Sequence, residues 1–149
     1  MKRVLQFIET TGPGGAETIF LSLLSGLDEG SWSVVPLVTG PGWLKARVQE
    51  MGFSPHELST AGSFDFRFLA GIKELIQKES IDLVHAHLQG ATVYSTLAAS
   101  WAGIPVVATF HGFPDLDFGG PTGWLKARLL RRSGTHVVCV SEALRQSVV

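Results

Sequence analysis

The stretch TGPGGAETIF, residues 11–20, joins a short apolar run to a segment with helical periodicity. The run Val4–Ile8 before it is typical of a buried strand, and apolar residues recur after it at the spacing of one helix face. Three glycines, at positions 12, 14 and 15, stand at this turn. They either form a tight turn with positive φ, or let bare backbone N–H groups at a helix N-terminus approach an anionic or hydroxyl-rich ligand.

The same alternation of strand and helix continues along the whole chain. Short apolar runs are predicted as strands at Arg3–Ile8, Ser33–Val38, Phe53–Leu58, Asp82–His87, Pro105–Phe110 and Thr135–Val140. Helical patterns lie between and after them, at Ala16–Leu27, Trp43–Met51, Phe66–Lys78, Ala91–Ala102, Gly123–Arg132 and from Glu142 onward. Nearly continuous apolar runs separated by helical crossovers are typical of parallel strands covered on both faces. The sequence therefore predicts one α/β domain over residues 1–149, a Rossmann-like doubly wound parallel sheet.

Composition limits the classes of function. The chain has 149 residues, 45% of them hydrophobic, and a formal net charge of -1. Such a balance does not suit a protein that binds nucleic acid by neutralising many phosphates, so no nucleic-acid partner is expected. The N-terminal apolar run is too short for a secretion signal and no stretch is long and apolar enough to cross a bilayer, so we expect a cytoplasmic protein.

Three common ligand-binding motifs lack their key residue. A dinucleotide-binding turn would have glycine where Glu17 stands, and an acidic residue near the end of the second strand, which instead ends in Val38 and Thr39. No lysine follows the glycines as a phosphate-binding P-loop requires. The G-x-S-x-G turn of serine hydrolases is also missing. The sequence thus predicts no NAD, and no cofactor of any kind.

Histidines gather where strands end, at the edge at which open α/β sheets bind ligands. His85 and His87 share one strand face, which permits a metal pair, but no third ligand stands at a matching spacing, so no metal is predicted. His111 directly follows a strand and precedes Gly112. It either acts in the site or orders the loop that follows it.

Four segments together resemble the N-terminal half of retaining glycosyltransferases of the GT-B fold, family 4. They are GPGGAE at 12–17, DLVHAH at 82–87, AGIPVVATFHG at 102–112 and VVCVSEALRQ at 137–146, in the family's order. The resemblance covers essentially the whole chain. It implies one lobe of a two-lobed enzyme, in which this acceptor-side lobe faces a second lobe that holds the nucleotide-sugar.

The resemblance also implies roles for individual residues. Gly14 and Gly15 would face the phosphate or sugar of the donor, and His111 would act as the catalytic residue near the transferred sugar. The other cleft candidates on the acceptor side are Glu17, His87, Gln89 and Gly112. The family's paired glutamates of the donor lobe are missing from this sequence, so residues 1–149 alone are expected to be inactive. GT-B enzymes typically need no metal.

Two questions stay open at the level of sequence. The segment at Gly123–Arg132, which carries Lys126, Arg128, Arg131 and Arg132 among apolar residues, is either a surface helix packed on the sheet or a peripheral contact with the inner face of a membrane. The function is transfer of a sugar to a glycan, lipid or small-molecule acceptor, or alternatively that of a noncatalytic Rossmann-like module that binds a sugar or nucleotide.

Overall fold

Six strands form one parallel sheet in the computed structural model, which describes residues 1–28, 30–61, 64–120 and 123–148. Their order is β3-β2-β1-β4-β5-β6, and every neighbouring pair is parallel. The strands are β1 (Lys2–Ile8), β2 (Trp32–Val38), β3 (His56–Glu57), β4 (Leu83–His87), β5 (Val106–Phe110) and β6 (His136–Cys139). The helices are α1 (Gly15–Gly26), α2 (Trp43–Glu50), α3 (Phe66–Lys78), α4 (Gln89–Ala102), the short 3₁₀ helix η1 (Phe113–Leu116), α5 (Gly123–Arg132) and α6 (Glu142–Val148).

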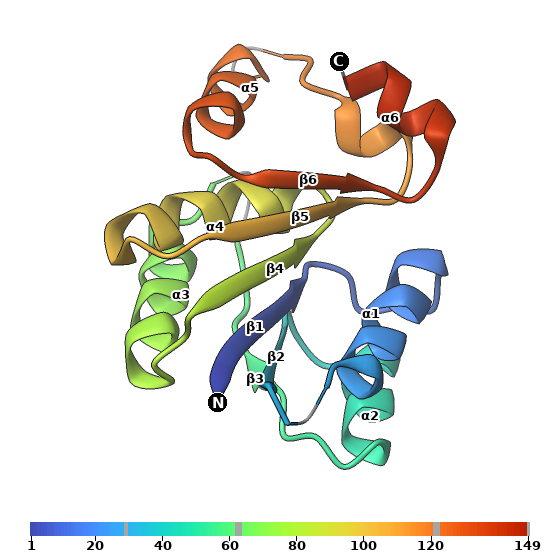
Figure 1. Cartoon of the computed structure of the whole chain (residues 1–149), viewed down its shortest axis with the longest axis vertical. Helices are drawn as coiled ribbons and strands as arrows, with labels where there is room; N and C mark the ends of the chain where they lie inside the picture. Colours follow the sequence, from blue (N-terminus) through green and yellow to red (C-terminus); the bar gives the residue numbers. More distant parts are fainter. Residues whose placement is uncertain (29, 62–63, 121–122, 149) are drawn as a thin grey trace.

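Helices cover both faces of this sheet, as expected for nearly continuous apolar strands. Helices α3 and α4 lie against one face and α1 and α2 against the other (Figure 1). A large apolar core joins strands β1, β2, β4 and β5 to α3 and α4, with Leu5, Phe7 and Ile72 fully buried. A smaller core on the opposite face packs Ile8 and Val38 against Phe20 of α1. The doubly wound α/β prediction is confirmed.

The order of the strands reverses between β1 and β4. The chain leaves β1 toward β2 and β3, and then returns to add β4, β5 and β6 on the other side of β1 (Figure 1). Helices α1 and α4, which follow β1 and β4, therefore depart to opposite faces. In open α/β sheets, ligands bind outside the carboxyl ends of the strands at such a point. The glycine turn and the segment after His87 both lie at this point.

The largest difference from the sequence-based prediction is β3. A strand was expected over Phe53–Leu58, but the paired segment contains only His56 and Glu57. Pro55 directly before it has no backbone N–H to contribute to a ladder. The strand is thus reduced to a short edge beside β2.

Among the described residues, no helix combines the length and apolar character needed to cross a membrane. The described part of α6 ends at Val148. Ser141 caps its first turn as the sequence predicted, because Ser141 Oγ accepts from the backbone N–H of Leu144 at 3.2 Å.

Candidate functional site

The predicted site residues lie at one edge of the sheet. The register pairs Ile8 with His87 and His87 with Thr109, so the ends of β1, β4 and β5 stand side by side. The segments that follow these strands, Gly12–Glu17, His87–Gly90 and His111–Asp115, consequently start from the same edge (Figure 1). This placement confirms the arrangement that strand-end reasoning predicted.

The three glycines of the turn after β1 do not adopt positive φ. All the glycines with positive φ in the described residues lie elsewhere, from Gly40 to Gly134, so the explanation by a strained turn is wrong. An added Cβ would meet nothing within 4 Å at Gly12 or at Gly15, whereas at Gly14 it would overlap the Glu17 carboxylate. Neither backbone strain nor internal packing therefore accounts for Gly12 and Gly15.

Glu17 folds back over this turn rather than pointing into open space. Its side chain is 6% exposed and accepts a hydrogen bond from Thr10 Oγ1. Because the carboxylate also lies against Gly14, it shapes the entry to α1 from within. The N-terminus of α1 itself has no side-chain cap, since Gly14 stands at the N-cap position.

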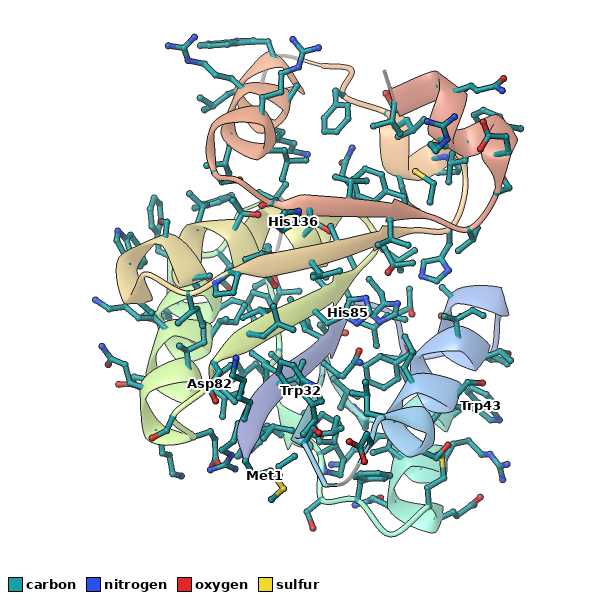
Figure 2. All side chains as sticks on the ribbon, in the orientation of Figure 1. Met1, Trp32, Trp43, Asp82, His85 and His136 are labelled. Atoms are coloured by element: carbon teal, nitrogen blue, oxygen red, sulfur yellow. The ribbon has the colours of Figure 1, made fainter. Side chains whose placement is uncertain are left out.

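A line of buried and half-buried polar side chains crosses the sheet behind the turn, and we call it the polar seam: Thr109, His85, Gln6, His87 and His111. The His85 ring bonds to Thr109 Oγ1 at 2.8 Å and to Gln6 Nε2 at 3.3 Å. The Gln6 Oε1 atom bonds to His87 Nε2 at 3.0 Å, and His87 Nδ1 bonds to His111 Nε2 at 3.0 Å. Gln6 and His87 are fully buried, and the His87 ring packs edge-on against Phe20 of α1. Figure 2 shows His85 among side chains between the sheet and α1.

Burial keeps the imidazoles of the seam neutral. Desolvation, together with the neighbouring histidines, lowers the pKa of His87 to about 2 and that of His85 to about 4. Desolvation also lowers the pKa of His111, while the carboxylates of Asp115 and Glu17 oppose that change. The seam therefore carries hydrogen bonds across the sheet without a net positive charge at neutral pH.

Asp115 organises the loop after β5. Its buried carboxylate accepts from the backbone N–H groups of His111 at 2.7 Å, Gly112 at 3.3 Å and Gln89 at 3.1 Å. The Gln89 amide donates to the carbonyl oxygens of Asp115 and Asp117, at 3.3 Å and 2.7 Å. The loop is thus held by a carboxylate that the sequence reasoning missed, and the His111 ring is not what holds it. The sequence offered one signal for this role, since Asp115 is an acidic residue three positions after Gly112, at a helix start.

Glu9 is a second carboxylate that the sequence reasoning missed. It accepts from the backbone N–H of Gly90 at 2.8 Å, and a Cβ on Gly90 would overlap its carboxyl group. Burial raises the pKa of Glu9, while hydrogen bonds from the backbone of Gly90 and Ala91 oppose the rise. Glu9 and Asp115 together fill the N-terminus of α4 with protein carboxylates. The N-terminus of α1 differs, because no side-chain hydrogen bond caps it and Gly14 and Gly15 are exposed there.

The backbone at Leu88 is strained. This residue is the single link between β4 and α4. Its backbone has φ 72° and ψ 166°, a conformation that residues with a Cβ rarely adopt. Its N–H donates to the Thr109 carbonyl at 3.1 Å, and its carbonyl accepts from the N–H of Thr92 at 3.1 Å. Strain of about 1–3 kcal/mol at such a position is tolerated only when the surroundings fix it.

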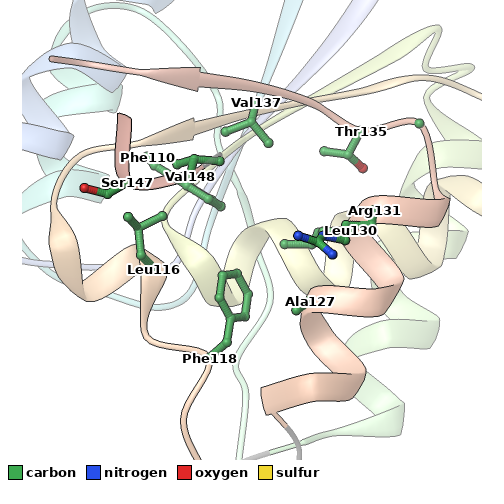
Figure 3. Close-up of a pocket in the computed structure, with 11 residues that line it drawn as sticks. Phe110, Leu116, Phe118, Ala127, Leu130, Arg131, Thr135, Val137, Ser147 and Val148 are labelled. Carbon is green, nitrogen blue, oxygen red and sulfur yellow. The ribbon is translucent and has the colours of Figure 1, made fainter. Parts of the chain in front are cut away.

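A separate apolar pocket of about 360 Å³ lies at the β6 end of the sheet (Figure 3). Phe110, Phe118, Leu130 and Val137 are among its walls, and none of the predicted site residues lines it. In the described ranges there is also no group of three or more His, Cys, Asp or Glu side chains placed to hold a metal ion.

Residues 13–149 match the sequence profile of Glycosyltransferase Family 4, which is nearly the whole chain. The chain belongs to glycosyltransferase family 4. Among curated proteins, none has a sequence that matches this family 4 chain significantly.

Solved structures share the fold of this family 4 domain. Anabaena Alr3699/HepE, solved with UDP and glucose, has a TM-score of 0.79 at 18% identity, over 99% of this chain and 40% of that one. A glycosyltransferase from Rickettsia africae ESF-5 has a TM-score of 0.76 at 21% identity, over 99% and 38%. Acinetobacter baumannii MurG has a TM-score of 0.63 at 16% identity, over 87% and 39%. At these identities the likeness shows the GT-B lobe fold, and the chain spans two fifths of the length of such structures.

The neutral histidines of the seam predict a pH dependence of stability. An unfolded histidine takes up a proton below pH ~6.5, whereas His85 in the fold does so only near pH 4. Between these values the unfolded state binds more protons, so stability is full above pH ~6.5 and falls as the pH is lowered, by about 1.4 kcal/mol per pH unit for this histidine. We expect His85→Gln to reduce the slope of unfolding free energy against pH by that amount, as measured by urea titrations from pH 7 to about 4.

The exposed His136 is the matched control for this experiment. The slope of unfolding free energy against pH should be nearly the same for His136→Gln and for the parent chain. All other titrating groups are common to the two proteins. Equal slopes for His85→Gln and the parent chain would contradict neutral burial of His85.

Proposed function

We propose that the full-length protein transfers a sugar from a nucleotide-sugar donor to a glycan, lipid or small-molecule acceptor, with retention of anomeric configuration. Residues 1–149 would form the acceptor-side lobe, and a further lobe would bind most of the nucleotide. The observation that carries the proposal is the open glycine turn at the uncapped N-terminus of α1, beside the polar seam that ends in His111. Family membership supports a transferase over a noncatalytic binding module.

The physical argument starts from the backbone at Gly14 and Gly15. Both are exposed, and they begin a helix whose first N–H groups receive no side-chain cap. Such an end favours negative charge through its dipole and its free donors. A pyrophosphate or the oxygens of a reacting sugar meet both conditions, and HepE was solved with UDP-glucose. We assign Gly14 and Gly15 to the donor and His111 to the transferred sugar, with Glu17, His87, Gln89 and Gly112 around the acceptor side.

The four residues on the acceptor side would act in two ways. His87 and Glu17 are buried, so their part would be to hold His111 and the glycine turn in place. Gln89 and Gly112 are half-buried on the loop that Asp115 organises. This loop would present its backbone to the acceptor. No step of the proposed transfer uses a metal ion or a cofactor from this lobe.

The overall proposal is tested on the full-length enzyme by following release of the nucleotide and the anomeric configuration of the product by NMR. Binding of a nucleotide-sugar without transfer would favour the noncatalytic module, and an inverted product would contradict retention. The sequence-based prediction that residues 1–149 alone are inactive is tested with the purified chain, where turnover would contradict it.

Substitution of Gly15 tests the glycine turn directly. Because Gly15 has no positive φ and a Cβ there meets no atom within 4 Å, Gly15→Ala should leave the unfolding free energy unchanged or raise it by about 0.4–1 kcal/mol. In the full-length enzyme the same Cβ should obstruct the donor and weaken its binding about tenfold, or ~1.4 kcal/mol. Calorimetric titration with the donor and thermal unfolding measure the two effects.

Gly26 provides the matched control, because it lies at the other end of α1 and a Cβ there also meets nothing within 4 Å. Gly26→Ala should leave donor affinity unchanged. Equal donor affinity for Gly15→Ala and the parent enzyme would remove the glycine turn from the site.

The roles of His111 and Asp115 separate in a second pair of variants. His111→Ala should lower kcat/KM by an amount that corresponds to about 2–4 kcal/mol of lost transition-state stabilisation. The melting temperature should change little, because the Asp115 carboxylate holds the loop backbone. Asp115→Ala should instead lower the unfolding free energy by about 1–3 kcal/mol, since it strips buried N–H groups of their acceptor.

Asp117→Ala serves as the control in the same loop, since this exposed carboxylate accepts only from the Gly119 N–H among the described residues. Asp117→Ala should leave both kcat/KM and the unfolding free energy near those of the parent. Near-normal turnover by a well-folded His111→Ala variant would exclude His111 from the site.

Contact with a membrane is proposed for α5. Its inner side packs on the core near Phe110 through Leu130, as the surface-helix interpretation expects. Its outer side nevertheless exposes 67% of Trp124 and 54% of Leu125, beside the exposed Arg128. Apolar and cationic side chains together favour the surface of an anionic bilayer. We therefore place the full-length protein in the cytoplasm, peripheral to the inner face of the membrane.

The double variant Trp124→Ser with Leu125→Ser should lose most cosedimentation with vesicles that contain anionic lipid. Trp101, which is also exposed but lies on α4, is the control, and Trp101→Ser should bind as the parent does. Failure of the parent chain to bind anionic vesicles would refute the membrane contact.

A further inference from the structure

The polar seam imposes a fixed order on its protons. A carboxamide has one oxygen that only accepts and one nitrogen that only donates. Gln6 presents its oxygen to His87 and its nitrogen to His85, at 3.0 Å and 3.3 Å. With the amide in this orientation, His87 Nε2 carries a proton and His85 Nδ1 is bare.

The position of the proton on one neutral ring determines its position on the next ring in the series. A neutral imidazole has one N–H and one bare nitrogen, so His87 Nδ1 accepts and His111 Nε2 must donate to it across 3.0 Å. On the other branch, the Nε2–H of His85 donates to Thr109 Oγ1 at 2.8 Å. Rotating the Gln6 amide by half a turn would reverse every donor in the series, and no mixed arrangement satisfies all of the bonds.

We propose that Gln6 is a positioning residue that determines which ring nitrogen of His111 carries the proton. Its buried amide places the proton of His111 on Nε2, which faces His87. This leaves Nδ1 as a bare acceptor, to which none of the described residues donates. A hydroxyl group of a bound ligand, and not an anionic or carbonyl oxygen, is the partner that this nitrogen would take. The relevance to catalysis rests on the proposed function, whereas the proton arrangement does not.

The location of Gln6 supports a positioning role over a packing role. It is fully buried on β1 at the level of His85, where a strand covered on both faces otherwise carries Leu5, Phe7 and Ile8. An amide buried in such surroundings is costly unless all its bonds are made. Both ends of the Gln6 side chain have partners, and both partners are histidines.

The test uses ¹⁵N NMR of the full 149-residue chain labelled at histidine, since protonated and bare ring nitrogens have well-separated resonances. We expect the Nε2–H tautomer for His87 and His111 in the parent chain. Gln6→Met keeps the size of the side chain but removes its acceptor. Because a buried N–H without a partner is tolerated less readily than a bare acceptor, His87 and His111 should both exchange toward the Nδ1–H tautomer.

Two further variants keep the test decisive. In Gln6→Glu, both carboxylate oxygens accept, so His111 should stay Nε2–H while His85 switches to Nδ1–H. In Thr109→Val, only the far end of the seam is removed, and the tautomer of His111 should not change. The backbone amide spectrum of each variant shows whether the fold is retained, and a variant that unfolds is replaced by Gln6→Leu for the same comparison.

An Nδ1–H tautomer of His111 in the parent chain, or a tautomer unaffected by Gln6→Met or Gln6→Leu, would overturn the proposal. These outcomes do not depend on turnover. A His111→Ala enzyme with normal activity would remove the proposed function but leave the tautomer assignment in place, so the two can fail separately.

Discussion

The pairing of β1 with β4 positions the glycine turn and most of the polar seam. This parallel register sets Gln6 beside His85 and Ile8 beside His87, across strands that are more than 70 residues apart in sequence. It brings together the glycine turn that follows β1 and the helix that follows β4, at the point where the order of strands reverses. A slip by one residue would turn the histidines and the core residues to opposite faces, so the apolar cores on both sides of the sheet fix the site as well as the fold.

The electrostatic character of the edge follows from how its two helix N-termini are filled. Helix α4 begins against the carboxylates of Glu9 and Asp115, which accept from its first N–H groups and from the loop after β5. Helix α1 begins at two exposed glycines with no cap. The two ends lie at the same edge, and of the two only that of α4 has its first N–H groups bonded to side-chain carboxylates.

Much of this was readable from sequence, because it depends on local patterns. Apolar periodicity located all six strands, and glycine and histidine at strand ends located the edge. The reduction of β3 was missed although a signal was present, because Pro55, which has no backbone N–H for a ladder, stands within Phe53–Leu58. Asp115, Glu9 and Gln6 were missed for a different reason. Each is an ordinary polar residue whose importance arises from a partner on another element, as between Gln6 and His87, and such partners become visible only once the register is known.

The direct junction at Leu88 has a mechanical consequence. His87 ends a strand and Gln89 begins a helix, so a single residue in a rarely occupied conformation separates them. A connection this short has no slack with which to absorb movement. Displacement of α4 would therefore be transmitted to β4 and to His87 at its end. The end of β4 and the start of α4 would move as one stiff piece, whereas the longer segments after β1 and β5 leave room for local adjustment.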